Sequence, residues 1–186
     1  MRDLGTRALE TARLRLRPLT AGDAEDMFAN WACDPEVTAF LTWQPHASAK
    51  ETREVLTAWV AHYDDPSYYH WTIESREAAT LIGTVGVVGA DAAIEMKEIG
   101  YCLGRPWWGR GYASEALAAV IEYLFDDVGA NRIEAQHDPA NVASGRVLAK
   151  CGMRQEGILR DRQRCNRGIA DAVMWAILAK DYRRPT

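Results

Sequence analysis

The sequence has little that suits a membrane, an oxidising compartment or a metal centre. None of its uncharged apolar runs approaches the length of a membrane span, and residues 1–7 lack the apolar core of a signal peptide. The cysteines are scattered with neither a CxxC pair nor zinc-like spacing, which is typical of free thiols in a reducing compartment; they are Cys33, Cys102, Cys151 and Cys165. We therefore expect a cytoplasmic protein that carries no metal and does not enter a membrane.

The sequence also lacks an excess of positive charge, low-complexity tracts, repeats and linkers. Its formal net charge is −4, so the composition does not suggest nucleic-acid binding. With 186 residues, the chain fits one domain that is long enough to bury a core of its own. The seven Trp and seven Tyr supply apolar mass for that core and for pocket walls. We expect a single domain over residues 1–186.

The hydrophobic periodicity predicts strands and helices in the order of an α/β (α+β) fold. Strands are expected at 12–19, 68–74, 81–88, 97–103, 132–137, 154–160 and 172–178. Helices are expected from Thr20 to about Cys33, from near Ser48, between the glycines at 111 and 129, and over 142–150. The first strand should expose a solvated basic face formed by Arg13, Arg15 and Arg17.

The most informative stretch is Arg105 to Glu115, R-P-W-W-G-R-G-Y-A-S-E, which lies between a predicted strand and an amphipathic helix. The first amides of a helix have no internal partner and sit at the positive end of its dipole, so a loop of small residues there admits a phosphate. A P-loop is excluded because Tyr112 and Ala113 follow Gly111, where Lys and Ser or Thr are needed. A dinucleotide fingerprint would need glycine where Ser114 stands. A purely structural turn stays open on these residues alone.

Two motifs carry a resemblance to a known family. The run W-G-R-G-Y-A resembles motif A of the GNAT superfamily of acyl-CoA-dependent N-acyltransferases, with Gly111 and Ala113 in its two small-residue places. Trp108 departs from the Gln or Arg that is usual at the first position. Downstream, N-x-x-S-x-R-V-L-x-K-x-G-M from Asn141 to Met153 is similar to the family's other CoA-side motif. The segments T-x-R-L-x-L-R-P and W-G-x-G-Y-A-x-E-A most resemble the RimJ/RimL-like branch, the ribosomal-protein N-terminal acetyltransferases and their relatives.

The resemblance covers nearly the whole chain, from the strand at Arg13 to the strand ending at Leu178. It implies a central mixed, mostly antiparallel sheet of about six to seven strands, flanked by helices and splayed between the fourth and fifth strands. It also implies an acetyl-CoA-dependent N-acetyltransferase that moves an acetyl group to a primary amine by direct transfer in a ternary complex. The alternative is a catalytically weak acyl-CoA-binding regulatory module that keeps the glycine loop without turnover.

The same resemblance implies where acetyl-CoA binds. The pyrophosphate would rest on amides of the glycine loop with Arg110 nearby, and the pantetheine arm would pair with the open strand edge at 99–103. Asn141 would hydrogen-bond a pantetheine amide, a role compatible with capping the following helix. Lys150 or Arg146 is placed to reach the adenosine 3'-phosphate, although surface solvation suits either. The expected CoA-binding residues are Tyr101, Cys102, Leu103, Trp108, Gly109, Arg110, Gly111, Tyr112, Ala113, Ser114, Asn141 and Ser144.

Acetyl transfer needs a neutral amine, a polarised thioester carbonyl and a proton for the departing thiolate. A backbone amide at 101–103 is expected to polarise the carbonyl. Many family members supply the proton from a Tyr at the position that Leu148 occupies here, so we expect Ser144 to replace it. Glu98, at the start of the strand that faces the site, is the leading candidate for the general base. His137, at the end of the next strand, is the second candidate.

The acceptor side is less defined by sequence. Its expected walls are an aromatic loop and the last hairpin: Trp31, Phe40, Trp43, Gln44, His46 and the segment Arg160 to Gly168. The basic run R-D-R-Q-R-C-N-R-G suggests an acceptor with an acidic portion or a partner surface, although such a run is usually a solvated loop. A peptide N-terminus, a polyamine, an antibiotic amine and an aminoacyl nucleotide all stay open as acceptors. A monomer and a homodimer are equally compatible with the sequence.

Overall fold

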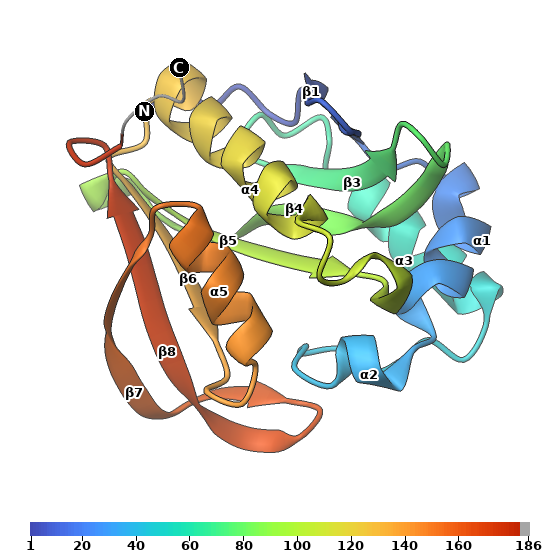
Figure 1. The fold of residues 1–186 in the computed structure, drawn as a ribbon. Coiled ribbons are helices and arrows are strands. Elements are labelled where there is room, and N and C mark those ends of the chain that lie inside the picture. Colours follow the sequence, from blue (N-terminus) through green and yellow to red (C-terminus); the bar gives the residue numbers. More distant parts are fainter. Residues whose placement is uncertain (183–186) are drawn as a thin grey trace.

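The computed structural model describes residues 1–182, which form one mixed sheet of eight strands flanked by helices (Figure 1). The spatial order is β1-β2-β3-β4-β5-β6-β8-β7, and β5 with β6 is the parallel pair in an otherwise antiparallel sheet. The strands are β1 Leu9–Glu10, β2 Leu14–Arg17, β3 His70–Ser75, β4 Thr80–Asp91, β5 Met96–Leu103, β6 Arg132–His137, β7 Arg154–Cys165 and β8 Gly168–Leu178. The predicted GNAT-type architecture is confirmed, with the two-residue β1 as one strand more than predicted. The last residues of the expected domain, 183–186, lie outside the described part of the chain.

The helices fall where the apolar spacing and the caps predict them, with one addition. The main helices are α1 Ala24–Met27, α2 Pro35–Thr38, α3 Ala49–Val60, α4 Tyr112–Glu122 and α5 Val142–Lys150. Shorter 3-10 and π-helical turns flank or connect them: η1 Ala21–Asp23, η2 Phe28–Ala32, η3 Ala92–Ile94, η4 Arg105–Trp107 and η5 Tyr123–Val128. The short α2, capped by the Asp34 side chain and begun by Pro35, was not predicted. Among residues 1–182, no helix has both the length and the apolar character that a bilayer span requires.

Helices cover both faces of the sheet. In Figure 1, α4 and α5 lie across the face nearer the viewer, and the larger apolar core between them and the sheet includes Leu117, Val120 and Ile133. A second core, which includes Met27 and Leu56, joins α1 and α3 to the opposite face. Burial of these apolar side chains holds each helix layer on the sheet, at about 1.5 to 3 kcal/mol for each large side chain.

The sheet opens between β5 and β6, as the resemblance predicted. These strands are paired at three positions, and the last of them joins Glu98 to Glu134. Beyond that point β5 continues to Leu103 beside β4, while β6 continues to His137 beside β8. The sheet therefore divides into two halves, and the edge of β5 from residue 99 onward faces an opening.

Three local expectations are corrected by the structure. The first strand spans Leu14–Arg17 rather than 12–19, because Pro18 cannot donate to the ladder. The last two strands are longer than the predicted 154–160 and 172–178, so most of the basic run from Arg160 lies within β7. The arginines of β2 do not form a purely solvated face, since Arg17 pairs with Asp23 at 2.9 Å and with Glu74 at 3.2 Å.

Candidate active site

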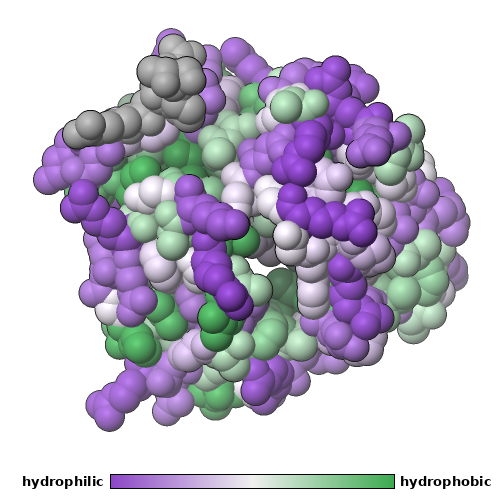
Figure 2. Space-filling model, in the orientation of Figure 1, coloured by the Kyte–Doolittle hydropathy of each residue, from purple (hydrophilic) through white to green (hydrophobic). Residues whose placement is uncertain are grey.

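A cavity of about 850 Å³ occupies the opening in the sheet. Figure 2 shows a hollow at the middle of the face that carries α4, α5 and α2. Its walls come from the free end of β5, the glycine loop, the end of β6, the first turns of α5 and the segment around α2. Such a volume lies in the range of small-molecule sites, and nearly all of the predicted CoA-binding residues line it.

The glycine loop forms one end of this cavity. Gly109 and Gly111 have φ angles of +74° and +81°, which residues with a side chain rarely adopt, and Gly111 caps α4. Tyr112, Ala113 and Ser114, which open α4, line the cavity together with both glycines. The first amides of this helix have no carbonyl partner within it, so this end of the cavity suits an anion.

Arg13 of the strand segment before β2 braces this loop, which corrects its expected place on a solvated face. Its guanidinium lies 2.6 Å from the Glu115 carboxylate, donates to the Arg110 carbonyl at 3.0 Å and stacks 4.4 Å from the centroid of the Tyr112 ring. Burial favours the neutral form of Glu115, but hydrogen bonds from Thr11 and Arg13 outweigh it and lower the pKa of that carboxyl. The side chain of Arg110 is exposed and is absent from the cavity lining.

Two other cations stand at the same end of the cavity. Arg146 and Lys150, one helical turn apart on α5, line it, and the neighbouring Cys151 thiol lies 3.5 Å from the Ser114 carbonyl at the start of α4. Because both residues are exposed, their side chains can move toward a bound phosphate. The glycine-loop end of the cavity therefore combines free helix amides with positive charge.

The middle of the cavity is bounded by the open strand edge and by Asn141. The Asn141 side-chain oxygen accepts a hydrogen bond from the Ser144 amide at 3.2 Å, so the predicted capping role is observed. The Asn141 oxygen is therefore used as the acceptor for the Ser144 amide, and the Nδ2 group is the donor at the cavity wall. On the other side, the Trp108 indole donates to the Leu103 carbonyl at 2.7 Å and fixes the end of β5.

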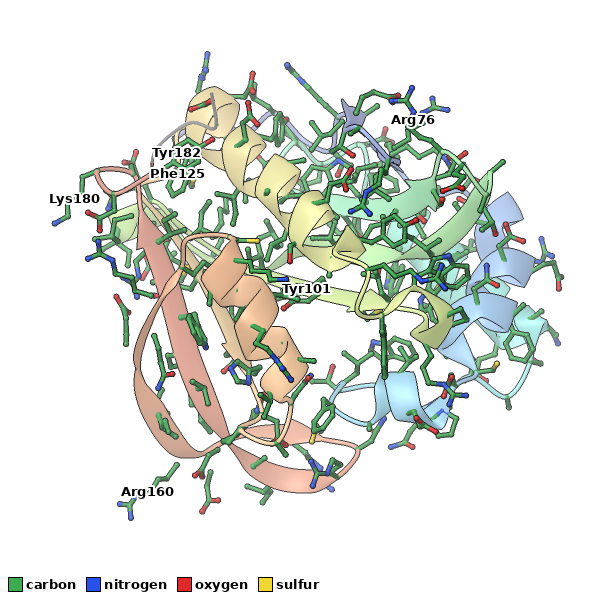
Figure 3. The ribbon with its side chains drawn as sticks, in the orientation of Figure 1. Arg76, Tyr101, Phe125, Arg160, Lys180 and Tyr182 are labelled. Atoms are coloured by element: carbon green, nitrogen blue, oxygen red, sulfur yellow. The ribbon has the colours of Figure 1, made fainter. Side chains whose placement is uncertain are left out.

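Ser144 has a partner that the sequence did not reveal. The Tyr101 hydroxyl lies 2.8 Å from Ser144 Oγ and 3.2 Å from the Ser144 carbonyl (Figure 3 shows Tyr101 between α4 and α5). Burial raises the pKa of Tyr101, so its hydroxyl stays protonated in the working range of pH. Leu148, which has no hydroxyl to offer, is fully buried in the core. In the sequence, the signal for this contact was the alternation along the strand, which puts Tyr101 on the same face as Ile99 and Leu103.

Glu98 lies beside the cavity rather than in its lining. Burial raises the pKa of Glu98, and repulsion from Glu134 adds to that effect, while Arg162 and a hydrogen bond from Gln136 oppose it. Gln136 lines the cavity, and its Oε1 is buried without a hydrogen-bond partner among the described residues. Gln136 therefore connects the predicted base to the cavity. Glu134 itself is engaged by Arg132 at 2.5 Å.

His137 lines the cavity, but its free nitrogen faces α5. Its Nδ1 lies 2.8 Å from the Asp138 carbonyl, so Nδ1 carries the proton and Nε2 is left as the acceptor. Nε2 is buried without a partner among residues 1–182 and would come within 2.8 Å of a side chain at Gly145. This packing explains the glycine and directs the lone pair of His137 away from the opening.

The expected acceptor walls are only partly formed by the predicted residues. Val37, Phe40 and Leu41 line the cavity, and from the segment 160–168 only Gln163 does so among the described residues. Other predicted members are packed elsewhere: Trp31 is fully buried, and His46 is buried against Thr52 at 2.8 Å. Trp43 and Gln44 contact the tip of the β7–β8 hairpin through Asn166. Arg160 points away from the molecule in Figure 3, and no arginine of residues 160–168 is part of the cavity lining. Arg167 instead stacks 5.0 Å from the centroid of the Phe40 ring.

Comparison with known proteins agrees with this geometry. A family model described as an acetyltransferase (GNAT) domain matches residues 13–154. The "Uncharacterized N-acetyltransferase p20" of Bacillus licheniformis is 33% identical over 174 residues, which cover 94% of this chain and 97% of that protein. A ribosomal protein uS5-alanine N-acetyltransferase of Escherichia coli (strain K12) is 34% identical over 84 residues, 45% of this chain and 43% of that protein. The solved structure of a putative ribosomal-protein-serine acetyltransferase from Vibrio cholerae has a TM-score of 0.80 at 25% identity, covering 92% of this chain and 97% of that one.

The splayed sheet, the glycine loop and these matches define an acyltransferase of the GNAT type, and the chain belongs to the GNAT acetyltransferase family. More particularly, it is an N-acetyltransferase with distant relatives in the RimJ/RimL-like, ribosomal-protein group. The family uses acetyl-CoA as the acetyl donor.

Proposed function

We propose that this protein transfers an acetyl group from acetyl-CoA to a primary amine by direct attack within a ternary complex. The observation that carries the proposal is the meeting of an unpaired strand edge and an anion-binding helix start in one cavity. An extended amide chain with phosphates at its end matches this combination of hydrogen-bonding edge and positive pole.

The residues of the chain divide the task of binding acetyl-CoA. The amides at the start of α4 hold the pyrophosphate, with Arg146 and Lys150 in reach of the phosphates. The β5 edge and the Asn141 Nδ2 group hold the pantetheine arm, and a backbone amide at 101–103 polarises the thioester carbonyl.

The chemical step needs two proton transfers. The amine nitrogen forms a bond to the carbonyl carbon while the carbon–sulfur bond breaks, and the nitrogen gives up a proton. Glu98 receives that proton, with Gln136 orienting the groups between it and the cavity. The Ser144 hydroxyl, held by its hydrogen bond to Tyr101, donates a proton to the thiolate. Ser144 then regains a proton from water and Glu98 releases the amine proton to water, so both groups return to their starting state.

The role of Glu98 leads to a pH prediction. A base acts when ionised, so kcat/KM should rise with pH through the pKa of Glu98, and a raised pKa places this acidic limb above the ordinary range of a glutamate. Glu98→Gln should abolish the acidic limb and lower kcat by about a hundredfold or more. Glu134→Gln removes the neighbouring repulsion and should shift the limb to lower pH while activity is kept. An unchanged acidic limb in Glu98→Gln would assign the base to another group.

The acceptor is proposed only as a class. Relatives named for ribosomal-protein alanine and serine acetylation support a protein N-terminus, and the size of the cavity also suits a small amine. Release of free thiol from acetyl-CoA should be followed across a panel containing peptides with free N-termini, polyamines, arylalkylamines and aminoacyl nucleotides. Thiol release with any member supports the proposal. Calorimetric binding of CoA without release for every amine would instead support an acyl-CoA-binding regulatory module.

A further inference from the structure

Asp138 is a buried carboxylate in the wall of the cavity. It follows the last residue of β6, is 8% exposed and lines the cavity. One of its oxygens, Oδ1, accepts a hydrogen bond from the Ala140 amide at 2.8 Å. The other, Oδ2, has the Cys165 thiol as its neighbour at 3.9 Å. No cationic side chain of residues 1–182 pairs with it at salt-bridge distance.

Such a carboxylate is costly to bury. An ionised carboxylate removed from water needs a cation or several hydrogen-bond donors, and buried Asp is rare without them. A single amide and a weak thiol donor do not meet that need, because a carboxylate has about four lone-pair sites. The structure therefore leaves a negative site facing the cavity for a positively charged ligand group.

The contacts of Asp138 place it at the end of the cavity away from the phosphates. Cys165, beside its free oxygen, precedes Asn166 in the hairpin tip. The Asn166 amide donates to the Leu41 carbonyl at 3.1 Å, and Leu41 lines the cavity with Phe40. Asp138 and apolar walls thus meet at one end, where the exposed Arg167, which is not part of the lining, stacks 5.0 Å from the centroid of the Phe40 ring. Free amides, Arg146 and Lys150 occupy the other end.

We propose that Asp138 binds the ammonium group of the acceptor, and that the acceptor is a primary ammonium carried on an apolar stem. Val37, Phe40 and Leu41 provide the surface for the stem. This inference rests on the proposed acetyl transfer for its biological meaning, but Asp138 acts by binding. The ammonium loses one proton to become the neutral amine and a second as the carbon–nitrogen bond forms; Glu98 receives them in turn and passes the first to water. It also replaces the expectation of an acidic acceptor, since no arginine of residues 160–168 lines the cavity and Arg167 stacks on the Phe40 ring.

A binding experiment tests this without turnover. The protein is saturated with CoA, which cannot donate an acetyl group, and titrated by calorimetry with 2-phenylethylammonium and with 2-phenylethanol, which share a stem and differ in charge. The wild type should bind the ammonium about tenfold or more tightly than the alcohol, and Asp138→Asn should remove that preference. Equal binding of the two compounds by the wild type, absence of binding of the ammonium, or a preference that survives in Asp138→Asn would overturn the inference.

The variants are chosen so that a folding defect cannot imitate the result. Asn keeps the oxygen that caps the Ala140 amide, so thermal unfolding of Asp138→Asn should match the wild type. Asp64→Asn, which makes the same charge change at an exposed turn, should keep the preference for the ammonium. In turnover, Asp138→Asn should raise the KM for charged amines. The KM for hydroxylamine, which is largely uncharged at neutral pH, should not change.

The two proposals can fail separately. Ammonium binding through Asp138 without thiol release for any amine would reject the proposed transfer and keep the cation site. Thiol release with the same KM for charged amines in Asp138→Asn as in the wild type would keep the transfer and reject the cation site.

Discussion

At the scale of single residues, the site depends on partners that come from different elements. Ser144 on α5 meets Tyr101 on β5, and Gln136 on β6 meets Glu98 on β5. Each of these contacts joins residues on the two sides of the opening between β5 and β6. The hydrogen bond to the buried Tyr101 fixes the position of the Ser144 hydroxyl, which is the physical reason to place Ser144 in the chemical step.

Ser144→Ala should lower kcat by about a hundredfold or more, because the departing thiolate loses its proton donor. Tyr101→Phe should cause a smaller loss of kcat, about tenfold, since Ser144 remains in place. Stopped assays of thiol release give kcat, and calorimetry gives the affinity for CoA, which should stay near that of the wild type. Ser67→Ala, at an exposed serine remote from the cavity, is the matched control. Full turnover of Ser144→Ala with normal CoA affinity would exclude this role.

The sequence predicted individual residues well where a motif fixes the backbone. Gly109 and Gly111 need positive φ angles, and Asn141 caps a helix, so residue type and position alone indicate their conformations. The side-chain partners were not predictable in this way. The contact between Tyr101 and Ser144 spans 43 residues, and no local pattern encodes it.

At the scale of elements, the glycine loop depends on Arg13 for its position. Gly109 lies in open space, since a side chain there would meet nothing within 4 Å, so packing does not hold this part of the loop in place. Arg13 connects the first turn of α4, through Glu115, to the carbonyl of Arg110. One cation from the β2 segment therefore fixes both ends of the turn that offers its amides to the phosphates.

Arg13→Gln should weaken CoA binding by about three- to tenfold, because the loop loses a charge-assisted brace worth about 1 kcal/mol at a half-exposed site. Calorimetric titration with CoA measures the change. Arg15→Gln is the matched control, because Arg15 is the next arginine along the chain and pairs only at 3.6 Å with Glu10 on the surface. Equal CoA affinity in the two variants would show that the loop keeps its shape without Arg13.

Strand lengths show where element prediction stops. The helices that bury one face, such as α3 and α4, follow their apolar spacing closely. The strand β7 is exposed along almost all of its length, so its sequence has no inside–outside alternation from which its full extent could be predicted. Its register with β8 also shifts twice, which allows the basic residues between 160 and 164 to lie on an irregular edge.

At the scale of the whole molecule, the function depends on a sheet in which β5 and β6 are paired over only part of their length. The pairing of β5 with β6 stops after three residues, and each half of the sheet is then held by its own neighbours. The family resemblance predicted this opening, because the motifs on both sides of it were present in the sequence. The sequence could not predict what holds the two halves together at the acceptor end, since that contact joins residues more than 120 positions apart.

That contact is the Asn166 side chain, and its removal should loosen the acceptor end. Asn166 donates to the carbonyls of Thr38 and Trp43 at 2.9 and 2.7 Å and accepts from Gln44 at 2.5 Å, so Asn166→Ala removes three hydrogen bonds that join the hairpin tip to the segment after α2. The free energy of unfolding should fall by about 1 to 3 kcal/mol, measured by chemical denaturation, and amide exchange should rise in residues 38–44. Asn166→Asp keeps the size and the acceptor but cannot donate, so it should lose most of the same stability. If the free energy of unfolding falls as expected but amide exchange in residues 38–44 does not change, then only the hairpin was weakened. The two halves of the sheet would then be held together by other contacts.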